Sequence, residues 1–359
     1  MTDLQALLER HEAFWNREEV DQPLVRLLPR KQEPIRFMDI YYNMVRDTIH
    51  FDNTDVYPDM LDVERVTPHI GQRNIRKQLV QGDLFRTEPA FTRIPWMEAI
   101  AGCDIHAGAE NAMWPEPALG PNYEGMDEIV PTDDNPWLQK LLALTQALVD
   151  INDGSYVVTH TLMRGPADML SGLLGDERMG LAFYDDPDKV DTCLARAAEA
   201  FIKVANAQFD VIPLFHGGRT AWIYGLWGSG SVIRFQSDSS SQLSPKMYAE
   251  RILPHDRKIM QAFDKSLIDL HSAGTLHIRE KLMETEELDC ISVTLDRYEN
   301  APTVEDLLPI FAEILEAKSL LIFGEMTAAE ADLLRTKLPA RGLAISGHIT
   351  DKLLWERPI

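Results

Sequence analysis

The sequence predicts an α/β protein, and more specifically a (β/α)8 TIM barrel with an irregular N-terminal loop-and-helix extension over the catalytic face. In the C-terminal half, short and continuously apolar runs alternate with amphipathic helical stretches. Such an alternation is typical of a parallel sheet that is covered by helices. The number of repeated units favours a closed barrel, and an open doubly wound sheet is the alternative. No G-x-G-x-x-G follows any candidate strand, so the simplest dinucleotide-binding interpretation is excluded.

The candidate strands are Tyr156–Leu162, Val211–Phe215, Ser266–His271, Cys290–Leu295, Ser319–Phe323 and Gly342–Ser346. Residues typical of helix starts stand between them at Asp186-Pro187, Ser244-Pro245, Thr303 and Thr327. Thr303 and Asp306 form a capping-box pattern. Pro254 lies inside the helical stretch that begins at Ser244, so we expect a kink or break there.

We expect one domain over residues 1–359, in which residues 1–90 form an N-terminal extension packed on the barrel. The chain has no Gly/Ser linker or tandem repeat that would divide it. Its first 150 residues or so are less regular, and Ile94–Trp96 and Trp114–Pro121 are typical of long loops. Long ordered loops on a barrel usually cover the ligand site.

Composition argues against a nucleic-acid-binding protein and against a membrane-spanning protein. The net charge of −22 comes without a basic stretch that could bind nucleic acid, so we expect a solvated acidic surface. No apolar run approaches the ~18 residues of a membrane span, and the N-terminus lacks the pattern of a signal peptide. The three cysteines are widely spaced and odd in number. They fit a reducing compartment, and we predict a soluble, cytoplasmic protein.

Polar residues follow three of the late strands, where a barrel places its function. His271 ends one strand, Glu325 follows the next in Gly324-Glu325, and His348 follows the last in Gly347-His348. His271, Glu325 and His348 could bind a divalent metal such as zinc, or they could act as general acids and bases without metal. They could also simply cap strands. Asp238 is a further candidate base or orienting group, so the catalytic candidates are His271, His348 and Asp238.

A second group of residues could bind the substrate. His216 and Arg219 stand beside Gly217-Gly218, where the backbone could approach a ligand closely. Tyr224 and Trp227 lie in an aromatic, glycine-rich stretch that could form a pocket wall. Arg219 or Arg164 could hold a carboxylate. The alternative is that these are tight turns with packing rings.

Several segments together resemble the uroporphyrinogen decarboxylase superfamily. Thr161–Gly175 (TLMRGPADMLSGLLG) is similar to its G-x-x-G-P-x-T-L-x-x-x-L-x-x-G stretch, and Gln236–Met260 to its D-x-S-x-x-L-S-P helix. Leu270–Gly274 (LHSAG) resembles its H-x-C-G turn, and Ile94–Gly102 a segment of its methyltransferase branch. The resemblance covers most of residues 90–350. It implies a single (β/α)8 barrel that decarboxylates porphyrinogens, transfers methyl groups between corrinoid proteins and thiols, or makes methionine.

Departures from the family pattern decide among these activities. The R-Q-A-G-R-Y segment that holds porphyrin carboxylates in the true decarboxylases has no counterpart, and Gly172 stands in place of their catalytic tyrosine. The chain is therefore expected to lie closer to the methyltransferase branch. There, the thiolate zinc ligand of the H-x-C-G turn is replaced by Ala273. A zinc site would have to use nitrogen and oxygen ligands, namely His271, Glu325 and His348.

We therefore predict a methyltransferase component of a corrinoid-dependent demethylation system. It would move a methyl group from a small methylated substrate, such as an aromatic ether, to a corrinoid protein that supplies the cofactor. One alternative is a decarboxylase or other lyase that acts on a small carboxylic acid with His and Asp. Another is a catalytically silent, ligand-binding barrel. Barrels of this size commonly pair, so a homodimer is a possible assembly.

Overall fold

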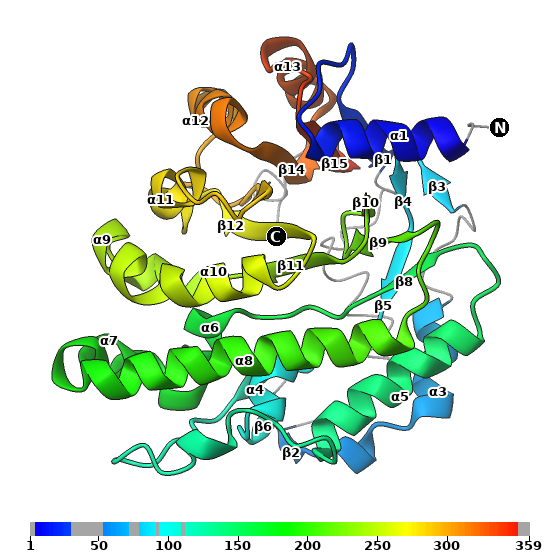
Figure 1. Ribbon diagram of the computed structural model, residues 1–359. Coiled ribbons are helices and arrows are strands. Elements are labelled where there is room, and N and C mark those ends of the chain that lie inside the picture. Colours follow the sequence, from blue (N-terminus) through cyan, green and yellow to red (C-terminus); the bar gives the residue numbers. More distant parts are fainter. Residues whose placement is uncertain (1–3, 30–52, 72–78, 91–92, 109–111, 351–359) are drawn as a thin grey trace.

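The computed structural model describes residues 4–29, 53–71, 79–90, 93–108 and 112–350. Its main element is a six-stranded sheet in the order β1-β15-β14-β13-β12-β11, and every neighbouring pair in it is parallel (Figure 1). The strands are β1 (Leu24–Pro29), β11 (Val232–Gln236), β12 (Lys265–His271), β13 (Cys290–Thr294), β14 (Ser319–Met326) and β15 (Leu343–Ile349). All their C-terminal ends therefore lie at one edge.

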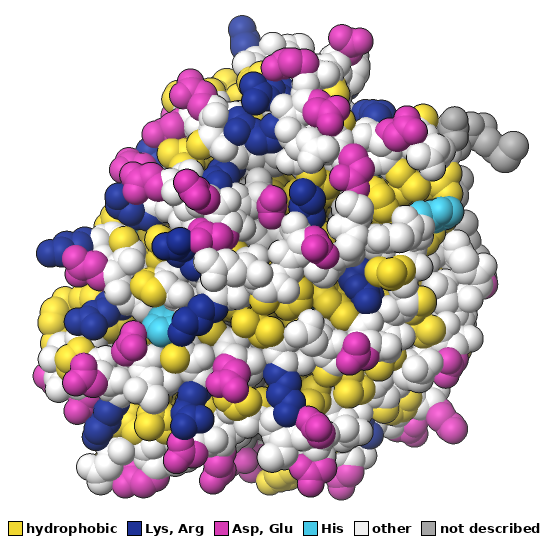
Figure 2. Space-filling model, viewed as in Figure 1, with side chains coloured by type: hydrophobic (Ala, Val, Ile, Leu, Met, Phe, Trp, Pro, Cys, Tyr) yellow, Lys and Arg dark blue, Asp and Glu magenta, His cyan; other side chains and the backbone are white. Residues whose placement is uncertain are grey.

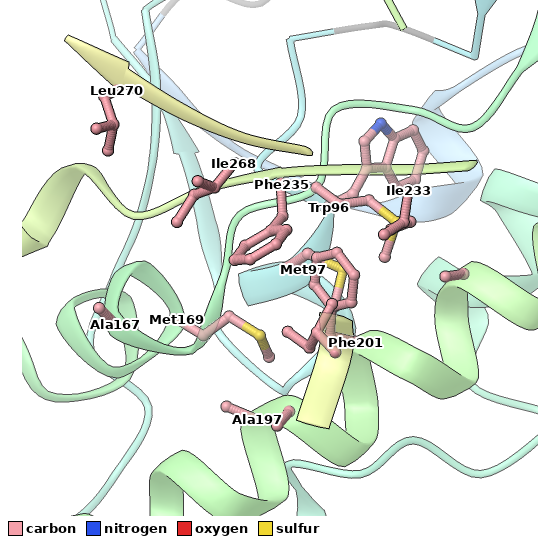
Figure 3. Packing of buried hydrophobic residues seen from close by; sticks show 14 of the residues in the cluster. Trp96, Met97, Ala167, Met169, Ala197, Phe201, Ile233, Phe235, Ile268 and Leu270 are labelled. Atoms are coloured by element: carbon pink, nitrogen blue, oxygen red, sulfur yellow. The ribbon is translucent and has the colours of Figure 1, made fainter. Parts of the chain in front are cut away.

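Helices separate these strands along the chain and cover one face of the sheet (Figure 1). The helices around the later strands are α8 (Pro187–Val211), α10 (Leu253–Gln261), α11 (Arg279–Met283), α12 (Val304–Ala317) and α13 (Ala328–Lys337). Figure 3 shows Phe235 of β11 directed toward Phe201 of α8, and the two rings pack edge to face at 5.9 Å between centroids. Ile233, Ile268 and Leu270 belong to the same buried cluster. Since strand side chains alternate, the residues between them face the other way, onto what we call the inner face.

A second pair of parallel strands, β5 (Thr87–Pro89) and β8 (Val157–Thr159), lies beside the sheet. Just after β8, Gly165 N–H donates to the Gln236 carbonyl of β11 at 2.9 Å, in a parallel bridge between Arg164 and Gln236. The predicted α/β fold with a parallel sheet is thus confirmed. Within the described residues, however, the strand ladders form a six-stranded and a two-stranded parallel sheet, and they do not close into a barrel.

Smaller elements surround this framework. The short strands are β2 (Thr54–Val56), β3 (Val80–Gln81), β4 (Leu84–Phe85), β6 (Ile105–Ala107), β7 (Met113–Pro115), β9 (Gly218–Ala221) and β10 (Leu226–Ser229). The remaining helices are α1 (Leu4–Trp15), α3 (Val63–Gly71), α4 (Trp96–Ile100), α5 (Pro136–Asp150), α6 (Pro166–Leu174), α7 (Asp176–Asp185) and α9 (Pro245–Met247). The expected extension over residues 1–90 includes β1, which is an integral strand of the main sheet.

The helix starts predicted at Asp186, Thr303 and Thr327 are confirmed, and both threonines form capping boxes. The irregularity expected near Pro254 is also present, because a π-helical turn at Tyr248–Ile252 precedes α10. The strand predicted at Val211–Phe215 is wrong. The helix α8 continues through Val211, and the next strand is β9, which pairs antiparallel with β10. Apolar residues at the end of a long helix were mistaken for a strand because a short apolar run has no clear period.

Helix α1 crosses the N-terminal ends of the strands. The Ser319 hydroxyl at the start of β14 donates to the Phe14 carbonyl at 2.8 Å. Trp15 Nε1 donates to the Trp227 carbonyl at 2.7 Å, in β10. This end of the sheet is therefore closed by the chain's own N-terminal helix.

None of the described helices is both long enough and apolar enough to span a membrane. On the face shown in Figure 2, Lys and Arg side chains are interspersed with Asp and Glu. The face shown thus carries both signs of charge, although the whole chain has a net charge of −22.

Candidate functional site

The inner face turns polar toward the C-terminal ends of the strands. Alternation along β11 places Arg234 and Gln236 on this face, since Ile233 and Phe235 pack into the main apolar cluster. On β12 the same argument places Asp269 and His271 there. The N-terminal part of the inner face is apolar and includes Val232, Leu267, Cys290, Leu321 and Ala344. Charged side chains are thus concentrated where parallel α/β sheets usually carry their sites.

His271 is paired with Asp296, which follows β13. His271 Nδ1 donates to Asp296 Oδ1 at 2.7 Å. This hydrogen bond is the main reason why the pKa of His271 is raised to about 9, against the opposing effect of burial. The imidazole is therefore protonated at neutral pH, and its Nε2–H is directed away from Asp296. The pair is an oriented acid with a proton available on the far side of the ring.

Asp296 is itself held in place from two sides. Its Oδ2 accepts from the Ala273 backbone N–H at 2.8 Å and from the Ser272 hydroxyl at 3.3 Å. Burial alone would raise the pKa of Asp296, but the hydrogen bonds from His271, Ala273 and Ser272 keep it below its usual value. Asp296 is therefore ionised when it orients His271.

Asp238 lies on the opposite side of the imidazole. Its Oδ1 is 3.9 Å from His271 Nε2, which is too far for a direct hydrogen bond. Burial, followed by the charge of Asp168, raises the pKa of Asp238 to about 6, although His271 acts in the opposite direction. The predicted catalytic residues His271 and Asp238 are thus neighbours, with more than a third of each side chain exposed (38% and 36%).

A buried layer supports these groups from below. Arg234 and Asp269 form an ion pair at 2.7 Å, and both side chains are almost fully buried. Asp269 also accepts hydrogen bonds from the Ser292 and Thr294 hydroxyls. Tyr224, predicted as a pocket wall, is buried in this layer, where its hydroxyl donates to the Ser292 oxygen at 3.2 Å, since the Ser292 proton goes to Asp269. Breaking a buried pair of this kind leaves an unpaired charge, so the layer should be rigid.

Arg164 lies behind Asp238, among other acids. Its Nη1 is 2.7 Å from Glu98 Oε1, and its Nε is 3.6 Å from Asp168 Oδ2. Both acids are fully buried, and burial raises the pKa of Glu98. Arg164 was predicted to bind a substrate carboxylate. The structure places it near the site, but its charge is already matched by two carboxyl groups.

Glu325 and His348 lie opposite each other on β14 and β15, within the strands rather than after them. Alternation along β14 and β15 places both on the inner face, as it does His271 on β12. However, among the residues that the structure describes, no three His, Cys, Asp or Glu side chains are arranged to hold a metal ion. The set His271, Glu325 and His348 therefore does not fit a preformed zinc site.

Three predicted substrate-binding residues lie away from His271. Arg219 donates to the Ile212 and Phe209 carbonyls, each at 2.7 Å, and so caps the C-terminal end of α8. His216 is exposed in the turn before β9, with a positive φ of 50°. Trp227 is buried beside α1, where its Nε1 donates to the Phe215 carbonyl at 2.8 Å. These residues have structural contacts at the other end of the sheet, and the glycines near them form turns of a hairpin.

Asp296 and Asp269 were missed in the sequence. A signal for each was present, because the alternation that places His271 on the inner face also places Asp269 there, two residues earlier. Asp296 directly follows the predicted strand Cys290–Leu295. Acids at such positions are as informative as histidines, although the sequence alone does not show which strands are neighbours.

No protein-family model matches the chain, and no curated protein sequence matches it either. Among solved structures, it is similar to a methyltransferase from Methanosarcina mazei, with a TM-score of 0.58 and 14% identity. This alignment covers 97% of the chain and 94% of the methyltransferase. A B12-independent methionine synthase from a Shewanella species, solved with selenomethionine, aligns over 58% of each chain with 13% identity and a TM-score of 0.38. The first likeness shows a shared fold over almost the whole chain.

Proposed function

We propose that this chain is a methyltransferase of the uroporphyrinogen decarboxylase superfamily, with β1, β5, β8 and β11–β15 as the strands of a (β/α)8 barrel. It would act in a corrinoid-dependent demethylation system on a small methyl ether. The fold that it shares with a methyltransferase supports the proposal. The observation that carries it is the hydrogen bond between His271 and Asp296, which leaves His271 Nε2 facing Asp238, and the raised pKa of His271 agrees with it.

Demethylation of an ether needs an acid more than it needs a base. When the bond between methyl carbon and oxygen breaks, the electron pair stays on the oxygen, which must gain a proton to leave as an alcohol. His271 can give this proton from Nε2 and become neutral, while Asp296 keeps the ring in place. A corrinoid on a partner protein would supply the nucleophile that accepts the methyl group.

His271 also limits which methylated compound can bind. A methylammonium nitrogen has no lone pair and cannot accept a hydrogen bond from His271 Nε2–H. An ether oxygen, in contrast, can accept one. The donor at Nε2 therefore favours ethers over amines as the methyl donor. Zinc binding by His271, Glu325 and His348 stays a separate prediction, and metal analysis of the purified protein with and without Glu325→Ala tests it.

The test compares two histidine variants in the same assay. The purified chain is given small aryl methyl ethers, such as 2-methoxyphenol, with chemically reduced free cobalamin as the acceptor. Methylation of the cobalamin is followed by its absorption spectrum. We expect His271→Asn to lower the rate by about 10²–10⁴-fold, the usual contribution of a positioned acid. His216→Asn is the matched control, since Asn tolerates the positive φ of this exposed residue, and its rate should not change.

Three outcomes would contradict the proposal. If His271→Asn keeps the parent rate, His271 is not the acid. If the chain instead releases CO2 from small carboxylic acids, the lyase alternative is correct. A silent barrel would show neither reaction and no difference between the two variants.

A further inference from the structure

A row of hydrogen bonds runs along the inner face from β12 to Asp238. Asp269 Oδ2 accepts from Arg234 Nη2 at 2.7 Å, and Arg234 Nη1 donates to Gln236 Oε1 at 2.8 Å. Gln236 Nε2 then donates to Asp238 Oδ2 at 2.6 Å. Since Arg234 and Asp269 are buried, the first half of the row is fixed by the core of the protein.

The direction of this row follows from the chemistry of its members. A guanidinium group can only donate hydrogen bonds, so the Gln236 amide must turn its carbonyl toward Arg234. Its NH2 group then has to face Asp238, and Oδ2 is the oxygen that accepts from it. Oδ1 is left facing His271. This oxygen is buried and accepts no hydrogen bond from the described residues.

The distance between Oδ1 and His271 Nε2 is one that a single oxygen atom can bridge. The two atoms are 3.9 Å apart, so an atom about 2.8 Å from each would make a hydrogen bond with both. His271 Nε2–H donates, since Nδ1 is occupied by Asp296, and the carboxylate oxygen of Asp238 accepts. One oxygen that accepts a hydrogen bond and donates another is a hydroxyl group. A buried acceptor without a partner is costly, and a ligand hydroxyl would satisfy it.

We propose that His271 and Asp238 together bind the hydroxyl group of an alcohol or phenol, and that Asp269, Arg234 and Gln236 are positioning residues that turn Asp238 Oδ1 toward it. This deepens and rests on the proposed function, because an alcohol or phenol is what remains when a methyl group leaves an ether oxygen. The charges of Arg164 and Asp168 also act on Asp238, and the row holds its Oδ2 on the Gln236 amide.

Asp238→Asn tests the direction of the row. The Asn carbonyl must accept from the Gln236 NH2 group, so the Asn NH2 takes the place of Oδ1. The site then presents two donors in place of a donor and an acceptor. Two donors suit an ether oxygen and disfavour a hydroxyl. Binding of phenol and of methoxybenzene is measured by NMR titration near pH 7.5, between the pKa values of about 6 for Asp238 and about 9 for His271.

We expect the parent protein to prefer phenol over methoxybenzene. Asp238→Asn should weaken phenol binding about tenfold and leave methoxybenzene binding equal or tighter, so that the preference reverses. In the double variant Gln236→Met/Asp238→Asn, no hydrogen bond from residue 236 orients the Asn amide. The reversed preference for methoxybenzene should therefore be lost. Gln146→Met is the matched control. Gln146 also donates to a carboxylate, Asp150, but does so on the exposed side of α5, and this variant should bind as the parent does.

The inference is overturned if the parent does not bind phenol, if Asp238→Asn keeps the parent preference, or if the reversal survives removal of Gln236. Thermal unfolding of each variant separates loss of the site from loss of the fold. Because these titrations need no methyl acceptor, they can succeed when the demethylation assay fails. The failure of the proposed function and the failure of this inference are therefore distinguishable.

Discussion

The two ends of the sheet each hold a histidine, and the two histidines differ in almost every property. His11 on α1 is fully buried at the N-terminal end, and its two ring nitrogens bond the Asp83 carbonyl and the Trp227 N–H. Burial lowers its pKa to about 4. His271 at the C-terminal end is partly exposed and bonded to Asp296, and its pKa is raised to about 9. At neutral pH one histidine is neutral and the other is charged.

This difference separates a histidine whose two ring nitrogens are both bonded from one that keeps a nitrogen available to a ligand. At the N-terminal end, His11 is neutral and both of its ring nitrogens have backbone partners, so it stabilises the fold and has no proton to exchange. At the C-terminal end, His271 keeps Nε2 without a hydrogen bond from the described residues, and Asp238 keeps Oδ1 unpaired beside it. Charged side chains with shifted pKa values beside an unpaired buried oxygen are typical of a ligand-binding site.

The largest effect on stability should come from the N-terminal end. His11→Ala leaves the Asp83 carbonyl and the Trp227 N–H buried without partners, and it opens a cavity under α1. We expect the free energy of unfolding to fall by about 3–5 kcal/mol, measured by urea denaturation. His271→Ala, with its exposed ring, should change stability far less. Equal losses in the two variants would contradict the distinction between the two ends.

Asp296→Asn should lower the pKa of His271. The amide cannot stabilise the imidazolium as the carboxylate does, so the pKa of His271 should fall from about 9 toward its ordinary 6.5. The proton on Nε2 would then be lost at neutral pH, and the alkaline limit of the reaction should shift to lower pH. NMR titration of the imidazole measures the pKa, and His11 in the same spectra is the internal control. A His271 pKa that stays near 9 would show that Asp296 is not its main partner.

The same two histidines predict opposite slopes of stability with pH. The pKa of His271 is higher in the folded state, so its contribution is complete below about 6.5 and is lost as pH rises toward 9. The pKa of His11 is lower in the folded state, so its contribution is complete above about 6.5 and is lost as pH falls toward 4. Urea denaturation across this range should show that Asp296→Asn flattens the alkaline slope only. A change confined to the acid side would contradict the assignment.

The sequence predicted the framework well because local signals determined it. Capping residues at Thr303 and Thr327 and the apolar runs of β12–β15 are properties of short segments, and the structure confirms them. His271 and Asp238, which the structure places side by side, were predicted for a related reason, since strand ends and loop acids can be read along the chain. The pairing of His271 with Asp296 joins two strands, and no local pattern shows which strands are neighbours.

The sequence is ambiguous where one residue has two physical uses. An arginine that follows two glycines is equally suited to a ligand carboxylate and to the carbonyls at a helix end, and Arg219 contacts the carbonyls at the end of α8. Trp227 in a glycine-rich stretch was expected to form a pocket wall, but it packs beside α1. Only the position of each residue relative to the sheet decides between these uses, and that position depends on contacts between distant parts of the chain.

Arg219→Met provides the smallest effect and tests this correction directly. The variant loses two hydrogen bonds to the end of α8 and the contact of the guanidinium with the Phe209 ring, at 4.4 Å from its centroid. We expect stability to fall by about 1–2 kcal/mol by urea denaturation, since Met keeps much of the apolar packing. Binding of phenol and the rate of demethylation should stay at the parent values. A variant that folds normally but loses ligand binding would return Arg219 to the site, and it would weaken the contrast between the end of the sheet that holds Arg219 and the end that holds His271.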